Sequence, residues 1–158
     1  LDLPQTFLLQ RGTFEHDSSI HWFLAFNQVN NNTQEYKRAV NTLMDSPAFA
    51  PGAQREVLNV DDDSKIFVTQ RSNKDETYVV VLNFSAFTHH DYRVGVKDKD
   101  NYAVVFNADL FEYAGGGRIA YPDQLPNQPS TNFELLDREI VLPMIAPYGI
   151  IVLKRQVK

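Results

Sequence analysis

Short segments with a strand-like pattern recur at close intervals through the chain after residue 55. The strongest covers residues 77–84, which are almost continuously apolar and β-branched and therefore predict a central strand covered on both faces. Polar turns at residues 61–64 and 72–76 separate the first three segments. Strands are expected at residues 56–60, 65–71, 77–84, 92–96, 102–107, 139–142 and 149–153. About seven short strands separated by turns predict a mainly β chain that folds as an antiparallel, Greek-key β-sandwich.

One amphipathic segment precedes the strands. Asn32 and Glu35 have the spacing of a capping box, and Pro47 stops a helix because the residue before proline leaves the α region. We therefore expect a helix over residues 32–45, after a loop at residues 27–33. Apolar residues at helical spacing share one of its faces: Tyr36, Ala39, Val40, Leu43 and Met44.

A long connection without a strand pattern covers residues 108–137, and loops of this length often carry function. It contains Gly115-Gly116-Gly117-Arg118, which lacks the Lys-Ser/Thr pair and the following helix of a phosphate-binding loop. We therefore expect a flexible loop at these glycines.

Charge and composition exclude several classes of function. The net charge is −5 and the basic residues are scattered, so nucleic acid is not an expected partner. The apolar runs are too short to span a membrane, and the absence of cysteine makes a reducing cytoplasm the expected location.

Two polar clusters could suggest a metal site. Asp61-Asp62-Asp63 is not followed by the Gly and Glu of a calcium loop and is expected to form a hairpin turn. His89 and His90 are adjacent and would point to opposite faces of a strand, so we expect them in a polar loop. No metal and no cofactor are therefore expected.

An ordered set of motifs runs through the strand-rich part of the chain. Val79-Val80-Val81-Leu82-Asn83-Phe84 is followed by Tyr92-Arg93-Val94-Gly95-Val96, by Val105-Phe106-Asn107-Ala108-Asp109, by residues 113–117 and by a closing turn and strand at residues 142–153. This set resembles the C-terminal all-β domain of glucan branching enzymes in the α-amylase superfamily (glycoside hydrolase family 13). Upstream, Trp22-Phe23-Leu24 and residues 41–49 resemble the end of that family's catalytic (β/α)8 barrel.

The resemblance implies a division of the chain into two parts. Residues 1–50, with the helix at 32–45, would be the C-terminal remnant of the barrel, and residues 51–158 would be the β-sandwich domain. The chain starts at Leu1 rather than at Met, so we expect a longer polypeptide that supplies the missing barrel. The family's catalytic carboxylates lie on earlier barrel strands, so no catalytic residue is expected here. Glu15-His16-Asp17 lies too close to Trp22 to match the family's His-Asp motif.

The function implied by the resemblance is that of a non-catalytic accessory domain. The parent would be a 1,4-α-glucan branching enzyme, which transfers α-1,4-linked chains to α-1,6 positions in glycogen or starch synthesis. The domain would stabilise the barrel and could offer a site for α-glucan. Two alternatives stay open, namely the same domain of an amylase or debranching hydrolase, and a stand-alone glucan-binding module.

Aromatic side chains are the candidate sugar-binding groups, because the apolar face of a sugar ring stacks on them. The candidates are Trp22, Tyr102, Tyr113 and Tyr121, of which the last two lie in the long connection. Alternatively, each packs in the core or against the missing barrel. Apolar surface at residues 22–26 and on the helix is expected to make the chain self-associate.

Overall fold

The computed structural model describes residues 28–157. Trp22 and Glu15-His16-Asp17 lie outside the described residues. One helix, α1 (Gln28–Met44), and a short 3-10 helix, η3 (Pro47–Phe49), precede the strands, and a second 3-10 helix, η4 (Phe111–Tyr113), lies in the long connection. The strands are β1 (Gln54–Asp61), β2 (Ile66–Ser72), β3 (Thr77–Asn83), β4 (His89–Val96), β5 (Asn101–Asn107), β6 (Gln128–Pro129), β7 (Arg138–Ile145) and β8 (Ile150–Gln156).

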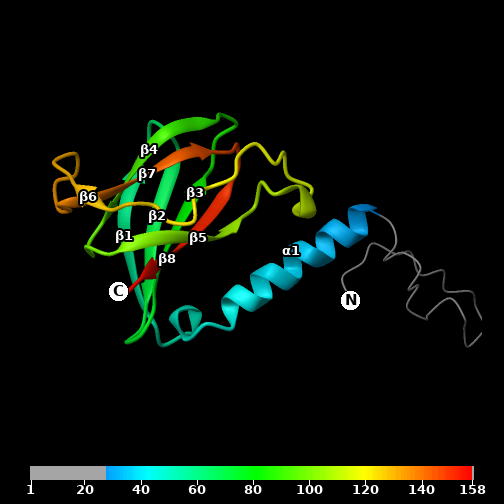
Figure 1. The fold of residues 1–158 in the computed structure, drawn as a ribbon, viewed down its shortest axis with the longest axis horizontal. Helices are drawn as coiled ribbons and strands as arrows, with labels where there is room; N and C mark the ends of the chain where they lie inside the picture. Colours follow the sequence, from blue (N-terminus) through cyan, green and yellow to red (C-terminus); the bar gives the residue numbers. More distant parts are fainter. Residues whose placement is uncertain (1–27, 158) are drawn as a thin grey trace, which may run out of the picture.

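The strands form two sheets, with the orders β1-β2-β3-β8-β5 and β4-β7-β6, and every pairing is antiparallel. The chain changes sheet on passing from β3 to β4, from β4 to β5, from β5 to β6, and again from β7 to β8. The prediction of a mainly β, two-sheet fold preceded by one helix is confirmed (Figure 1). All seven expected strands are present, and the short β6 is an addition.

The differences from the predicted strands have local causes. Strand β6 is only two residues long and contains Pro129, so its sequence shows no alternating pattern from which a strand could be predicted. β4 begins at His89, so His89 and His90 lie in a strand and not in the expected polar loop. The register of β1 shifts between Val57 and Asn59, which marks a bulge in an edge strand.

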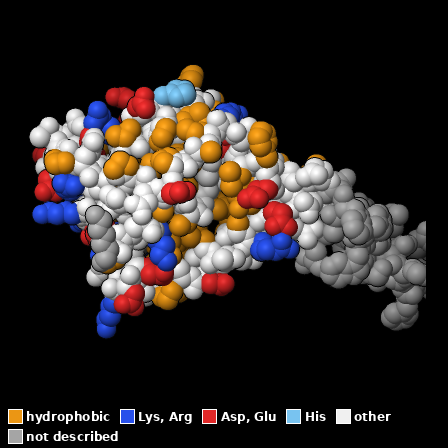
Figure 2. Space-filling view, viewed as in Figure 1, with side chains coloured by type: hydrophobic (Ala, Val, Ile, Leu, Met, Phe, Trp, Pro, Cys, Tyr) orange, Lys and Arg blue, Asp and Glu red, His pale blue; other side chains and the backbone are white. Residues whose placement is uncertain are grey.

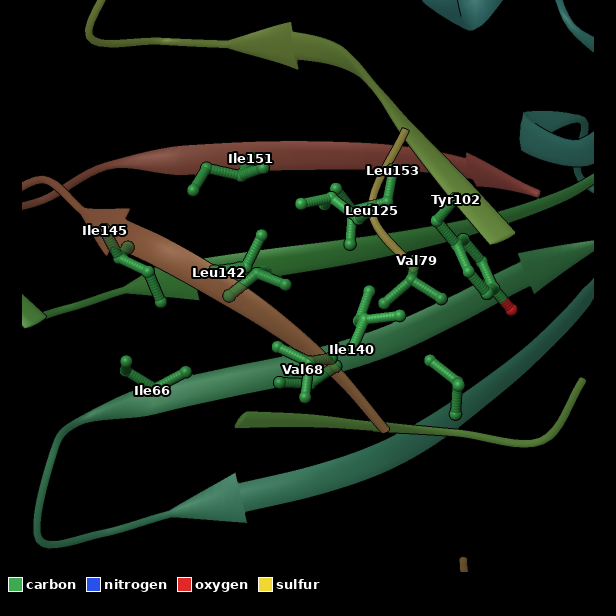
Figure 3. Packing of buried hydrophobic residues seen from close by; sticks show 13 residues of the cluster. Ile66, Val68, Val79, Tyr102, Leu125, Ile140, Leu142, Ile145, Ile151 and Leu153 are labelled. Carbon is green, nitrogen blue, oxygen red and sulfur yellow. The ribbon is translucent and has the colours of Figure 1, made fainter. Parts of the chain in front are cut away.

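The main core lies between the two sheets. Its fully buried side chains come from both layers: Ile66, Val68, Val79, Val81, Val94, Val96, Tyr102, Leu125, Ile140, Leu142, Ile145, Ile151 and Leu153 (Figure 3). β3 is covered on both faces as predicted, because Val79 and Val81 point into this core while Tyr78 and Val80 pack on the opposite side. Residues that alternate along β3 therefore serve two different packing layers.

α1 covers the outer face of the five-stranded sheet (Figure 1). Four apolar residues of the predicted face pack there against Tyr78, Phe106, Tyr113 and Val152; they are Tyr36, Ala39, Val40 and Leu43. Met44, the fifth residue of that face, is 52% exposed. Within residues 28–157 no helix has the length and apolar character needed to cross a bilayer.

The start of α1 differs from the prediction. The described helix begins at Gln28, so the expected loop at residues 27–33 and the capping box at Asn32 are wrong. Asn32 lies inside the helix, where its Oδ1 accepts a hydrogen bond from Gln28 Nε2 at 2.6 Å. Thr33 Oγ1 likewise donates to the Val29 carbonyl at 2.9 Å. Because these polar side chains form their hydrogen bonds with atoms one turn earlier in the helix, they do not interrupt it.

Candidate functional site

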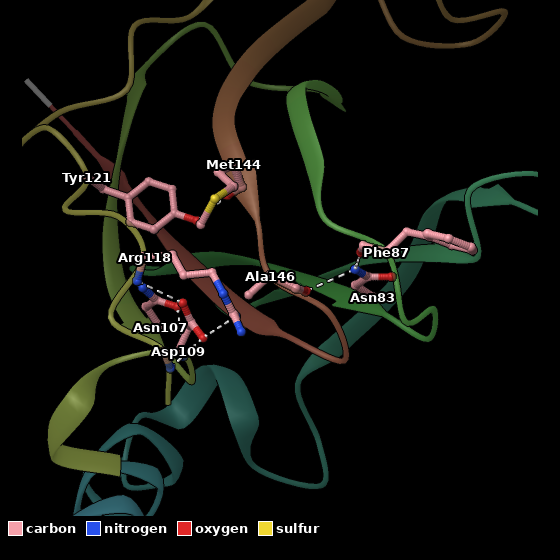
Figure 4. Close-up of polar contacts among 9 residues, drawn as sticks. Asn83, Phe87, Asn107, Asp109, Arg118, Tyr121, Met144 and Ala146 are labelled. Atoms are coloured by element: carbon pink, nitrogen blue, oxygen red, sulfur yellow. Dashed lines mark hydrogen bonds and ion pairs between the residues drawn. The ribbon is translucent and has the colours of Figure 1, made fainter. Parts of the chain in front are cut away.

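The long connection after β5 is organised around Asp109, which is 7% exposed. Its carboxylate accepts hydrogen bonds from the backbone N–H of Gly116 (2.9 Å) and of Arg118 (3.1 Å), and from the Arg118 guanidinium (2.7 Å) (Figure 4). The Asp109 backbone N–H donates to Asn107 Oδ1 at the end of β5. These hydrogen bonds tie residues 116–118 to the end of β5.

The glycines are required by this arrangement. A Cβ on Gly115 would lie 2.3 Å from the Asp109 carbonyl carbon. Gly117 has a φ of 54°, a backbone conformation that residues with a Cβ rarely adopt. The backbone N–H of Gly117 donates to the Asp109 carbonyl at 2.6 Å. The glycine run therefore allows the backbone to close around the carboxylate.

Tyr113 joins the long connection to α1. Its ring stacks on Phe106, with the ring centroids 5.6 Å apart and the planes at 20°, and meets Tyr36 edge-on at 5.8 Å. Burial, followed by the charge of Glu112, raises the pKa of the Tyr113 phenol. The ring is half-buried.

Tyr121 and Tyr102 pack differently. Tyr121 is half-buried against the main core, and its hydroxyl donates to the Met144 carbonyl (Figure 4). Tyr102 is fully buried, and its hydroxyl lies 3.3 Å from Asp98 Oδ2. No face of the Tyr102 ring is open to a sugar. Tyr102 is therefore a core residue, as the alternative interpretation expected, and not a sugar-binding residue.

A groove of about 330 Å³ runs between β5 and the long connection. Tyr121, Pro122 and Asp123 line one wall, and Val105 and Asn107 of β5 line the other. Of the tyrosines predicted from the sequence, only Tyr121 lies on this groove, because Tyr113 faces α1 and Tyr102 is in the core.

A polar junction of Ser46, Glu76 and Lys154 holds the segment that follows α1 against the sandwich. Glu76, just before β3, accepts hydrogen bonds from Ser46 Oγ and from Lys154 Nζ of β8, both at 2.5 Å. Lys154 also lies 5.3 Å from the centre of the Tyr78 ring. A groove of about 450 Å³ between α1 and the sheet opens beside this junction, with Arg38 and Lys154 in its lining. Sequence reasoning missed the pair, whose members are 78 positions apart.

The acidic turn and the histidines have local partners. Asp61 accepts from the backbone N–H of Ser64 and from the Tyr92 hydroxyl, each at 2.9 Å, and thereby ties the predicted β1–β2 hairpin to β4. His89 Nε2 lies 3.2 Å from Ser85 Oγ. In the part of the chain that the structure describes, no three His, Cys, Asp or Glu side chains are grouped closely enough to hold a metal ion.

Comparison with known proteins identifies the class to which this two-sheet domain belongs. The profile of the α-amylase C-terminal all-β domain family matches residues 56–156, and the chain belongs to that family. The 1,4-alpha-glucan branching enzyme GlgB of Clostridium perfringens is 28% identical over 134 residues, which cover 80% of this chain and 20% of that protein. The 1,4-alpha-glucan-branching enzyme of Solanum tuberosum is 31% identical over 106 residues, which cover 62% of this chain and 12% of that protein.

The chain therefore spans about a fifth or less of the length of these two relatives. Among solved structures, it resembles an isomaltulose synthase mutant from Erwinia rhapontici NX5 in complex with D-glucose, with a TM-score of 0.51 and 18% identity. That match covers 82% of this chain and 19% of the other chain, and at this identity it shows the fold alone.

Proposed function

We propose that this chain is the C-terminal accessory part of a glucan branching enzyme and contributes no catalytic residue. In this proposal residues 1–50 are the end of the catalytic barrel and residues 51–158 are the sandwich domain. The similarity to two branching enzymes favours this parent over the amylase and debranching alternatives. It also favours a covalently linked barrel over a stand-alone module, because those relatives are about five or more times longer than the matched segment.

The observation that carries the proposal is the way α1 is held. One face of the helix is packed on the outer side of the sheet, and the Ser46–Glu76–Lys154 junction fixes the segment that follows it. Val29, 67% exposed, and Met44, 52% exposed, are apolar residues near the two ends of α1 that stay largely exposed. In this proposal the barrel docks on the exposed surface of a helix that is already anchored to the sandwich, and the sandwich would thereby stabilise the barrel.

We further propose that the domain contacts α-glucan and works in the cytoplasm. The groove beside Tyr121 offers an aromatic ring and the carboxylate of Asp123, which suits a sugar with one apolar face and several hydroxyls. Tyr113 and Trp22 stay sugar-binding candidates in this proposal. A sequence without cysteine is consistent with a reducing compartment.

Two assays test the accessory role. The chain is first incubated with amylose, and iodine absorbance and reducing ends are followed; both should stay constant, and branching or cleavage by the chain alone would overturn the proposal. A Clostridium perfringens enzyme that lacks the matched segment is then compared with the intact enzyme. Loss of thermal stability on truncation is expected, whereas equal stability and activity would contradict a stabilising role.

A further inference from the structure

The outer face of the five-stranded sheet is only partly covered. α1 and η3 pack there over β3, β8 and β5, on Tyr78, Val80, Phe106, Ile150 and Val152. Figure 2 shows hydrophobic side chains that stay at the surface of the sandwich beside α1. An exposed apolar area next to a packed helix marks a site of contact with another segment or molecule.

The strand register shows which side chains of β1 and β2 share this outer face. Ile66 and Val68 point into the core between the sheets, so Phe67 between them points to the outer face. Val60 of β1 is the direct partner of Phe67, and directly paired residues lie on the same face of a sheet. Val60 therefore lies on the outer face, where it is 57% exposed.

Phe84 and Val57 extend this apolar area in the two directions along the strands. Phe84 follows β3, is 66% exposed, and lines a hollow of about 240 Å³ together with Val60 and Phe67. Val57 is paired with Thr69, two positions from Phe67, and is 54% exposed. We call Val57, Val60, Phe67 and Phe84 the outer strip.

Two arginines lie at the Val57 end of the outer strip. Arg55 and Arg71 are directly paired across β1 and β2, and each is two positions from a residue of the outer face. Like charges directly opposite each other are unfavourable in a sheet. Among the described residues neither guanidinium forms an ion pair. This end of the strip therefore favours an acidic partner.

The direction of α1 brings the preceding segment to the Phe84 end of the strip. Tyr36 meets Phe106 near the end of β5, with the ring centroids 5.6 Å apart. β5 and β3 are both antiparallel to β8, so Phe84 lies at the same end of the sheet. The eight residues of α1 before Tyr36 add about 12 Å of helix, which reaches past the ends of the strands (Figure 1).

Residues 1–27, which lead into α1, have the composition of a partner for the outer strip. Their apolar run Trp22-Phe23-Leu24-Ala25-Phe26 suits an apolar surface. Their charged residues are the acids Asp2, Glu15 and Asp17 and the base Arg11, which gives a net charge of −2 (one positive minus three negative). The segment thus combines an aromatic end with an acidic part, as the strip combines an apolar end with two arginines.

We propose that residues 1–27 cover the outer strip of the same chain. The run at residues 22–26 packs on Val60 and Phe84, and Asp17 lies at the two arginines. Five positions separate Asp17 from Trp22, and five separate Arg55 from Val60, so two extended segments side by side bring both contacts into register.

The covalent connection permits this placement. Six positions separate Trp22 from Gln28 at the start of α1, and an extended chain of this length spans up to about 20 Å. The inference goes beyond the proposed function, because an internal contact of this kind does not depend on which enzyme the parent is. It leaves Tyr113 and Tyr121 as the sugar-binding candidates.

Trp22 is the single tryptophan of the chain, so its fluorescence reports on this contact. Acrylamide quenching of the full chain is measured at several protein concentrations, with the same chain unfolded in urea as the exposed reference. Trp22 is expected to be shielded in the folded chain. Phe84→Ala should weaken the packing about five- to tenfold and raise the quenching towards the reference. Phe87→Ala is the matched control, because Phe87 is 74% exposed on the same loop and does not line the hollow.

A second variant separates loss of this contact from loss of the fold. Arg71→Gln removes the like-charge pair with Arg55, so the melting temperature should stay the same or rise. The same change removes a charge that attracts the acidic segment, so the quenching of Trp22 should increase. A variant that merely unfolds would instead show a lower melting temperature.

Each remaining outcome overturns the proposal. Quenching of the folded wild-type chain equal to that of the unfolded chain would show that residues 22–26 do not pack on the sandwich. Equal quenching of the wild-type chain and Phe84→Ala, or equal increases in Phe84→Ala and Phe87→Ala, would place Trp22 elsewhere. Shielding that appears only at high protein concentration would mean that a second copy of the chain covers the strip. All these results leave the accessory role standing, which the amylose and truncation assays test.

Discussion

The hydroxyl of Ser130 donates a 2.6 Å hydrogen bond to the carboxylate of Glu139 and so joins the long connection to β7. Glu139 is 1% exposed and accepts further bonds from Asn132 Nδ2 (2.8 Å) and Gln128 Nε2 (2.9 Å), as well as from the Arg93 guanidinium. Burial on its own raises the pKa of this carboxyl. The hydrogen bonds and the Arg93 charge outweigh burial, and they hold the pKa at about 2, below the ordinary 4.5.

The stability of the chain should therefore fall in acid. A carboxyl whose pKa is lower in the folded chain stabilises the fold above its unfolded pKa, and this contribution is lost as the pH falls from about 4.5 towards 2. For Glu139 the contribution at neutral pH is on the order of 3 kcal/mol. Melting temperatures measured between pH 7 and pH 2 should show this decline, and Glu139→Gln should flatten it. An unchanged slope in Glu139→Gln would exclude Glu139 as the cause.

Truncation of a core leucine should cost far more than truncation of a surface leucine. Leu142 is fully buried between the sheets, whereas Leu135 is 90% exposed. Leu142→Ala should lower the free energy of unfolding by about 2–5 kcal/mol, because it removes buried surface and leaves a cavity. Leu135→Ala should change it by less than about 0.5 kcal/mol. Urea denaturation measures both, and similar losses would contradict the assigned core.

Closure of the long connection around Asp109 should not tolerate a side chain at Gly115. In Gly115→Ala the new Cβ would clash with the Asp109 backbone, and a loss of about 2 kcal/mol or more is expected. Gly52→Ala is the control, since a Cβ there would have nothing within 4 Å. Thermal melting compares the two variants, and a neutral Gly115→Ala would mean that the loop does not close as described.

The junction at Glu76 should hold the segment that follows α1 against the sandwich. Glu76→Gln weakens the bonds to Lys154 and Ser46, and a loss of about 1 kcal/mol is expected, with faster hydrogen exchange in α1 and η3. The control is Glu56→Gln, because Glu56 pairs with Lys97 where both side chains are about half exposed. Such exposed pairs contribute less than about 0.5 kcal/mol. Equal exchange rates in the two variants would argue against the junction.

The chain should self-associate at high concentration. Several large apolar side chains are more than half exposed, among them Val29 and Met44 on α1. Sedimentation velocity over a range of concentrations should show dimers or larger species, and Met44→Lys should reduce them because a charge opposes burial of that surface. A clean monomer at every concentration would contradict this prediction.

Local patterns account for what the sequence could predict. β3 is recognisable because its neighbouring residues are almost continuously apolar and β-branched, so that Val79 and Val81 can face the main core while Tyr78 and Val80 face the second packing layer. The end of α1 was predictable from Pro47 for the same reason. Its start was not, because the polar side chains of Asn32 and Thr33 bond within the helix rather than capping it.

The functional surfaces depend on contacts that no local pattern contains. Asp109 is bonded to residues seven and nine positions later, and Glu76 is bonded to Lys154 across 78 positions. The sequence placed Tyr102 among the candidate tyrosines, whereas its complete burial became visible only once the two sheets had been packed.

The position of β8 between β3 and β5 in the five-stranded sheet affects the order of events during synthesis. β8 is synthesised after the other strands of this sandwich, yet it pairs with β3 on one side and with β5 on the other. Until it emerges, β3 has an unpaired edge and β5 has no partner in the sheet, and both expose backbone groups that could pair with other chains. A premature stop codon within β8 would therefore remove an interior strand of the sheet and release an incomplete chain to chaperones or proteases.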